Sequence, residues 1–200
     1  MLNVKLRYKD LIFLIIFIVL TIIVYFRILL PIEYPIILQL GKYTSTLSNL
    51  AYAISLVGNP ITTLLFILIF VYIDLTKRHN LSTVTLSFIT SVIICSILEL
   101  IIKELLPIER PIQQVFMTRY SYPSGHVARL TITTYHADKH ELIPRTITII
   151  LILLIPLLAI SRLILQAHYI SDVTGGLLLG YIISTFLYQY ISHLHREKGI

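Results

Sequence analysis

Three short polar clusters stand at the ends of otherwise apolar stretches of this chain. They are Lys103-x6-Arg110-Pro111, Pro123-Ser124-Gly125-His126 and Ser161-Arg162-x5-His168-x3-Asp172. Together they supply three cations, a serine–glycine pair, two histidines and a carboxylate. These are the groups that bind a phosphate and transfer it, because phosphoryl transfer depends on positioning and on neutralising charge. The clusters therefore predict a site for phosphoryl chemistry.

The cations and the serine–glycine pair suit the oxygens of a phosphate. Arg110 and Arg162 can each hold two oxygens with a planar guanidinium, and Lys103 adds a point charge. Ser124 and Gly125 come where a helix is expected to begin, so their backbone N–H groups can face an anion. Glycine also lets the backbone approach closely. We expect these five residues to cradle the charge that develops in the transition state.

The two histidines suit the covalent and proton-transfer steps. His168 and Asp172 are four residues apart, so on a helix they share one face and the carboxylate can orient the imidazole. His168 then suits the role of nucleophile, through a phosphohistidine intermediate. His126 arrives from a different loop and can protonate the leaving oxygen, then activate water.

This arrangement requires neither a metal nor another cofactor. The cations already supply positive charge, and the carboxylates are not clustered as in a magnesium site. A zinc site made of His126, His168 and Asp172 is possible by residue type. The neighbouring lysine and arginines would repel the dication, so we expect no bound metal.

The elements that position these clusters are predicted to be membrane-spanning helices. Hydrophobic residues make up 56% of the chain and charged residues 13%, about half the usual charged share. The 200 residues leave room for about six spans of roughly 20 residues each. We expect an all-α, polytopic membrane bundle with one domain over residues 1–200. The net charge of +6 is attributed to cytoplasmic loops, not to nucleic-acid binding.

The order of the spans places all three clusters on one face of the membrane. Spans are expected at about residues 11–30, 59–75, 81–102, 126–137, 143–164 and 171–191, with 43–57 lying at the interface. Because successive spans alternate in direction, the loops after the third and fifth spans emerge on the same side. Most other lysines and arginines gather on the opposite side. The positive-inside rule then predicts an extracytoplasmic site and cytoplasmic termini.

Two further ionisable residues lie close to the clusters in the sequence. Glu99 and Lys103 form an i,i+4 pair, so we expect Glu99 to orient Lys103 or to balance its charge. Arg129 lies one turn into the fourth span, where an ionisable group indicates a function. It can reach a second phosphate of a pyrophosphate, pair with Glu99, or extend to the interface.

The three clusters, in this order and with this spacing, resemble the signature of the type 2 phosphatidic acid phosphatase superfamily. Every signature position is present between Lys103 and Asp172, and the six spans are similar to those of the integral-membrane members. The resemblance implies metal-independent hydrolysis of a lipid phosphate or pyrophosphate. It also implies His126 as acid/base and His168 as nucleophile. Arg129 departs from the pattern, since members usually continue after Pro-Ser-Gly-His with small or apolar residues.

The expected location favours a polyprenyl diphosphate carrier lipid as the substrate. Phosphatidate and phosphatidylglycerophosphate are the alternatives, and no residue separates the three; the oligomeric state is equally open. A non-catalytic lipid-binding or transport protein would lack a nucleophile or a cradle cation, and none is missing. A vanadate haloperoxidase shares such a cradle, but those enzymes are typically larger and soluble, unlike this apolar chain.

Overall fold

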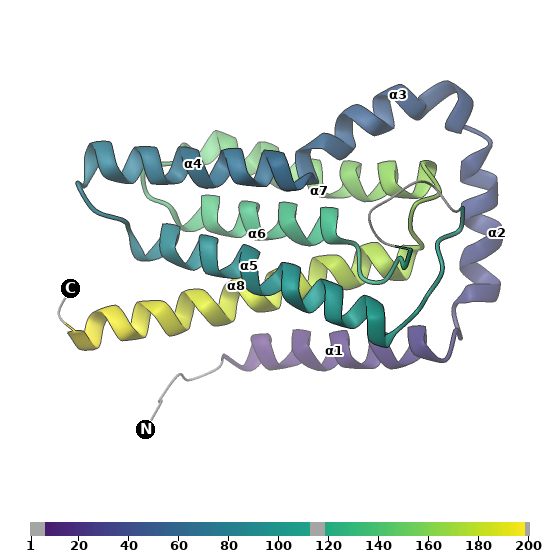
Figure 1. The fold of residues 1–200 in the computed structure, drawn as a ribbon, viewed down its shortest axis with the longest axis horizontal. Coiled ribbons are helices and arrows are strands. Elements are labelled where there is room, and N and C mark those ends of the chain that lie inside the picture. Colours follow the sequence, from purple (N-terminus) through teal and green to yellow (C-terminus); the bar gives the residue numbers. More distant parts are fainter. Residues whose placement is uncertain (1–6, 113–118, 199–200) are drawn as a thin grey trace.

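The computed structural model describes residues 7–112 and 119–198, and this part of the chain is helical without a β-strand. The helices are α1 (Tyr8–Tyr25), α2 (Leu30–Gly41), α3 (Thr44–Ser55), the short 3-10 helix η1 (Leu56–Gly58), α4 (Pro60–Lys77), α5 (Thr83–Leu105), α6 (Gly125–Lys139), α7 (Arg145–Ile164) and α8 (Ile170–Lys198). In Figure 1, α1, α4, α5, α6, α7 and α8 run side by side, and α2 and α3 form an arm at one end.

Five of the described helices, α1, α4, α5, α7 and α8, are long and apolar enough to cross a membrane. The sixth, α6, has 15 residues and lies in the middle of the bundle (Figure 1). The expected all-α membrane bundle with about six spans is therefore confirmed. The least apolar span is the one that its neighbours shield from lipid.

The first span is shorter than the sequence predicted. It ends at Tyr25, where we expected it to reach about Leu30. Arg27 adopts a left-handed backbone conformation with φ 55°, which interrupts the helix. Pro31 does not stop the first helix but lies in the first turn of α2, where its missing N–H leaves no hydrogen bond unmade. The chain thereby turns from the bundle into the arm.

The predicted start of the second span is confirmed. Asn59 is the N-cap of α4, and its side-chain oxygen accepts a hydrogen bond from the Ile61 N–H at 2.9 Å. Pro60 takes the first helical position, which suits its fixed φ. Ser82 caps α5 in the same way, with its hydroxyl accepting from the Thr85 N–H at 3.2 Å. These caps fix where the two spans begin and hence the faces on which their side chains lie.

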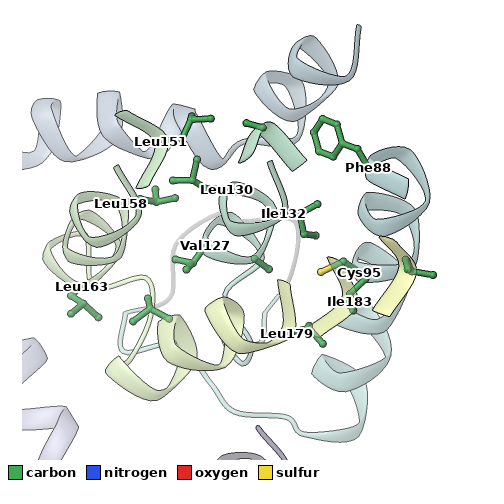
Figure 2. Packing of buried hydrophobic residues seen from close by; sticks show 14 of the residues in the cluster. Phe88, Cys95, Val127, Leu130, Ile132, Leu151, Leu158, Leu163, Leu179 and Ile183 are labelled. Carbon is green, nitrogen blue, oxygen red and sulfur yellow. The ribbon is translucent and has the colours of Figure 1, made fainter. Parts of the chain in front are cut away.

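The hydrophobic core surrounds α6. Figure 2 shows Val127, Leu130 and Ile132 of α6 enclosed by side chains from α5, α7 and α8. Gly176 and Gly180 of α8 form a small-residue pattern that permits close helix approach. A Cβ atom at Gly180 would lie 2.5 Å from the carbonyl oxygen of Ala128, so only glycine lets α8 lie directly against α6.

The three polar clusters lie at the end of the bundle that carries the arm. Helices α5 and α7 run toward this end and α6 and α8 begin there, while α1 begins and α8 ends at the opposite end (Figure 1). This is the common face that alternating spans predicted. The fold thus gathers residues from four helices and two connecting loops into one region.

Candidate active site

His168 lies in the turn between α7 and α8 with 1% of its surface exposed. Its Nδ1 is 3.3 Å from Oδ2 of Asp172, and the Tyr169 N–H donates to the same oxygen at 2.8 Å. Asp172 thus reaches back to the start of its own helix, as in a capping box. The predicted orientation of His168 by Asp172 is present in the structure.

Arg110 settles which nitrogen of the imidazole carries the proton. Its Nη1 lies 3.2 Å from Nε2 of His168 and donates to the Ala167 carbonyl at 2.7 Å. A guanidinium has only donors, so Nε2 of His168 must present its lone pair. The proton is then on Nδ1 and is donated to Asp172. This is the tautomer in which Nε2 is available as a nucleophile.

The electrostatic environment keeps His168 neutral. Burial lowers the pKa of its imidazole well below the ordinary value, and the charges of Arg110, Arg162 and Lys103 lower it further. His126 also acts on the same ring. All three predicted cations and the second histidine therefore lie within electrostatic range of His168. A neutral imidazole is the form that attacks phosphorus.

Arg162 is held by a chain of hydroxyl groups that begins on the arm. Its Nη1 donates to Oγ of Ser55 at 3.2 Å, and the hydroxyls of Ser55 and Ser161 are 3.2 Å apart. Ser161 donates to the Leu158 carbonyl at 2.7 Å, so the remaining proton between the two serines belongs to Ser55. Ser55 lies in α3, and no motif in the sequence marked it.

We expect Ser55→Ala to lower kcat/KM for phosphate release by roughly tenfold, because a buried charged donor loses its acceptor. The substitution removes one oxygen and leaves the helix otherwise unchanged. Ser45→Ala, on the exposed surface of the same helix, is the matched control. Initial rates of phosphate release measure both variants, and equal rates in the two would contradict the role of Ser55.

Ser124 and Gly125 begin α6, but the serine differs from expectation in one respect. The Ser124 N–H donates to the carbonyl of Asp172 at 2.9 Å, so it does not face a ligand. Its hydroxyl is buried and has no hydrogen-bond partner among the described residues. The first N–H groups of α6, beginning at Gly125, have no acceptor within the helix, so they can donate to an anion.

Glu99 lies between two cations. Oε1 accepts from Nζ of Lys103 at 2.6 Å, and Oε2 accepts from Nη1 of Arg129 at 3.1 Å. Arg129 also donates through Nε to the Gly58 carbonyl at 3.1 Å. The predicted Glu99–Lys103 pair is confirmed. Of the three predicted positions for Arg129, the structure shows the pair with Glu99.

The arm supplies contacts that sequence reasoning missed. Besides Ser55 and Gly58, Glu33 of α2 accepts from the N–H and the hydroxyl of Ser171 at 2.7 and 2.8 Å. Glu33 therefore satisfies the first turn of α8 next to Asp172. A carboxylate in an apolar stretch was the available signal for Glu33. Ser55 and Gly58 carried no signal, because their partners are 107 and 71 residues away in the chain and follow no spacing rule.

A cavity of about 230 Å³ opens beside the site. Its lining includes Arg27, Tyr34, Arg110 and Tyr169, which come from the α1–α2 turn, from α2 and from the two motif loops. A ligand can therefore reach Arg110 through this cavity from the end of α1, at the boundary of the bundle. The cavity is large enough for a phosphate headgroup but not for a lipid tail.

Two comparisons relate this architecture to known proteins. The model of the PAP2 superfamily matches residues 80–196, which include all three polar clusters. The structure is similar to the crystal structure of a transmembrane PAP2-type phosphatidylglycerolphosphate phosphatase from Bacillus subtilis, with a TM-score of 0.80 and 21% sequence identity. The similarity covers 96% of this chain and 98% of that one. The fold therefore extends over nearly the whole of both proteins.

Proposed function

The chain belongs to the PAP2 superfamily, and on that basis we propose that it hydrolyses a lipid phosphate without a metal, through a phosphohistidine on His168. The observation that carries the proposal is the buried, neutral imidazole. The Nδ1–H of His168 donates to Asp172, and the Nε2 lone pair of His168 faces Arg110. Arg110, Arg162 and Lys103 supply the positive charge that a metal would otherwise supply.

In the first step, Nε2 of His168 attacks the terminal phosphorus, and the bond from that phosphorus to the oxygen that joins it to the rest of the lipid breaks. When the substrate binds, a phosphate oxygen accepts the hydrogen bond from Arg110 that Nε2 of His168 accepts in the free protein. The lone pair of Nε2 is then available to attack. Arg110 and Arg162 hold the equatorial oxygens. His126, at the first turn of α6, takes up a proton when the anionic phosphate offsets the charge of the cations around it, and donates that proton to the leaving oxygen.

In the second step, water attacks the phosphohistidine. His126, which lost its proton in the first step, now accepts a proton from the water. The N–P bond breaks, the electron pair returns to Nε2, and inorganic phosphate leaves. Asp172 stabilises the cationic imidazole of the intermediate and restores the starting tautomer. The cycle needs no group beyond these residues and water.

For the substrate, we favour a polyprenyl diphosphate carrier lipid. The support is the predicted extracytoplasmic position of the site, which follows from the distribution of lysine and arginine. The tail would stay in the bilayer while the headgroup enters beside Arg110. Phosphatidylglycerophosphate is the second candidate, favoured by the similarity to the Bacillus subtilis protein. Phosphatidate is the third, and it carries a single phosphate.

Purified protein in EDTA, offered the three lipids side by side, tests this function. We expect inorganic phosphate to be released in EDTA at a rate within about twofold of the rate without EDTA, because protein cations neutralise the phosphate. The lipid with the highest kcat/KM identifies the substrate class. Loss of release in EDTA that magnesium restores would contradict the metal-free mechanism. Absence of release from all three lipids would contradict lipid phosphatase activity on these headgroups.

A further inference from the structure

Arg129 is the cation that the proposed mechanism does not use. It is 9% exposed, and two of its nitrogens already donate to Glu99 and to the Gly58 carbonyl. Its guanidinium therefore lies at the contact between α5, α6 and η1, and its charge also reaches the ring of His126. Burying an arginine in a membrane protein costs free energy, so its presence indicates a function.

The carboxylate of Glu99, beside Arg129, lies where its negative charge would repel the phosphate of the substrate. A Cβ atom at Gly125 would be 2.2 Å from both oxygens of Glu99, so the carboxylate packs onto the first residue of α6. That helix terminus is also where the phosphate is expected to bind. Alone, Glu99 would repel the phosphate and cancel most of the charge of Lys103, whose Nζ is 2.6 Å away.

Counting charges shows what Arg129 changes. Lys103 and Glu99 together have no net charge, whereas Lys103, Glu99 and Arg129 together carry one positive charge. Lys103 can add a third positive charge to those of Arg110 and Arg162 only if a second cation neutralises Glu99 on the side away from Lys103. Arg129 occupies that side.

Building on the proposed function, we propose that Arg129 is a positioning residue that neutralises Glu99 and so keeps the charge of Lys103 available to the substrate phosphate. Glu99 fixes Lys103 in place, and Arg129 removes the electrostatic cost of having a carboxylate there. The role depends on charge. It does not depend on contact between Arg129 and the substrate.

Four proteins test this inference: wild type, Arg129→Gln, Arg129→Lys and the double variant Glu99→Gln with Arg129→Gln. The readouts are the Kd of inorganic phosphate by calorimetry and the KM for the lipid substrate, with thermal unfolding in detergent to check folding. We expect Arg129→Gln to raise both constants roughly tenfold, because it leaves a buried carboxylate near the phosphate. Arg129→Lys keeps the charge and should stay within about threefold of wild type.

The double variant gives the decisive comparison. It removes both charges, and the amide oxygen at position 99 can still accept from Lys103, so phosphate binding should recover to within about threefold of wild type. A purely structural role for Arg129 predicts weaker phosphate binding in the double variant than in Arg129→Gln, because the effects of two lost buried contacts would add. A double variant that binds phosphate as weakly as Arg129→Gln, or more weakly, overturns the inference.

The test is independent of turnover. If wild type releases no phosphate from any lipid, the proposed function fails, while the calorimetric comparison still decides the role of Arg129. If Arg129→Gln does not fold, the double variant and Arg129→Lys are compared with wild type directly. Weak phosphate binding in a folded double variant then overturns the inference.

Discussion

His168→Ala is expected to lower the rate of phosphate release by at least about 10⁴-fold, because the variant lacks the atom that attacks phosphorus. The bundle should still form, since the ring contributes one side-chain contact to Asp172 and one to Arg110. Phosphate release under saturating lipid measures the effect. The thermal midpoint and the size-exclusion profile of the detergent-solubilised protein establish that the variant is folded.

His193→Ala is the matched control for this variant. His193 lies on α8 toward the opposite end of the bundle and pairs with Glu197 at 3.4 Å. The same substitution there should leave the rate within about twofold, as for a partly exposed side chain away from the site. A folded His168→Ala protein with the rate of His193→Ala would show that another group attacks the phosphate.

Arg162→Lys is expected to lower kcat/KM by about 100-fold, because an ammonium cannot reproduce two parallel hydrogen bonds to phosphate oxygens. The charge is unchanged, so the loss reports geometry alone. The lysine would also lack Nη1, the atom that donates to Ser55 at 3.2 Å. The measurement is kcat/KM for the preferred lipid in detergent micelles.

Arg145→Lys provides the comparison on the same helix. Arg145 begins α7 at the opposite end, where its exposed side chain pairs with Asp138. The substitution there is expected to change kcat/KM by less than about twofold. If Arg162→Lys were as active as Arg145→Lys, Arg162 would act as a simple positive charge and its planar fork would be unnecessary.

The sequence contained most of what determines the helices and their order. Long apolar stretches predict spans because a bilayer leaves no partner for unpaired backbone groups. The second span was expected to begin at about residue 59, and the structure shows why: Asn59 caps α4 and Pro60 takes its first position. The break at Arg27 was not predictable, because arginine rarely adopts a positive φ and no proline or glycine marks the turn. The apolar stretch continues past it, and only the packing of α2 determines where the helix ends.

The candidate site was predictable where its residues follow a spacing rule. His168 and Asp172 are four apart, and Glu99 and Lys103 are four apart, so helical periodicity placed each pair together. The contact of Arg110 with His168 could not be found that way, since it depends on two loops and the four helix ends that they join. The same holds for Ser55 and Arg162. Such pairs meet because the arm folds over the motif end of the bundle, and no local pattern encodes that meeting.

The central claim is that phosphate passes through Nε2 of His168. The most direct test is to mix the His126→Gln variant with the preferred lipid, quench with base, and map bound phosphate by mass spectrometry and ³¹P NMR. The variant lacks the acid of the first step as well as the base of the second, so 4-nitrophenyl phosphate, whose leaving group departs without a proton, is offered beside the lipid. The intermediate should accumulate from this ester, because no base activates water. We predict an acid-labile phosphohistidine at His168, substituted on Nε2. Phosphate on another residue, or continued turnover with no phosphoenzyme, would contradict the account.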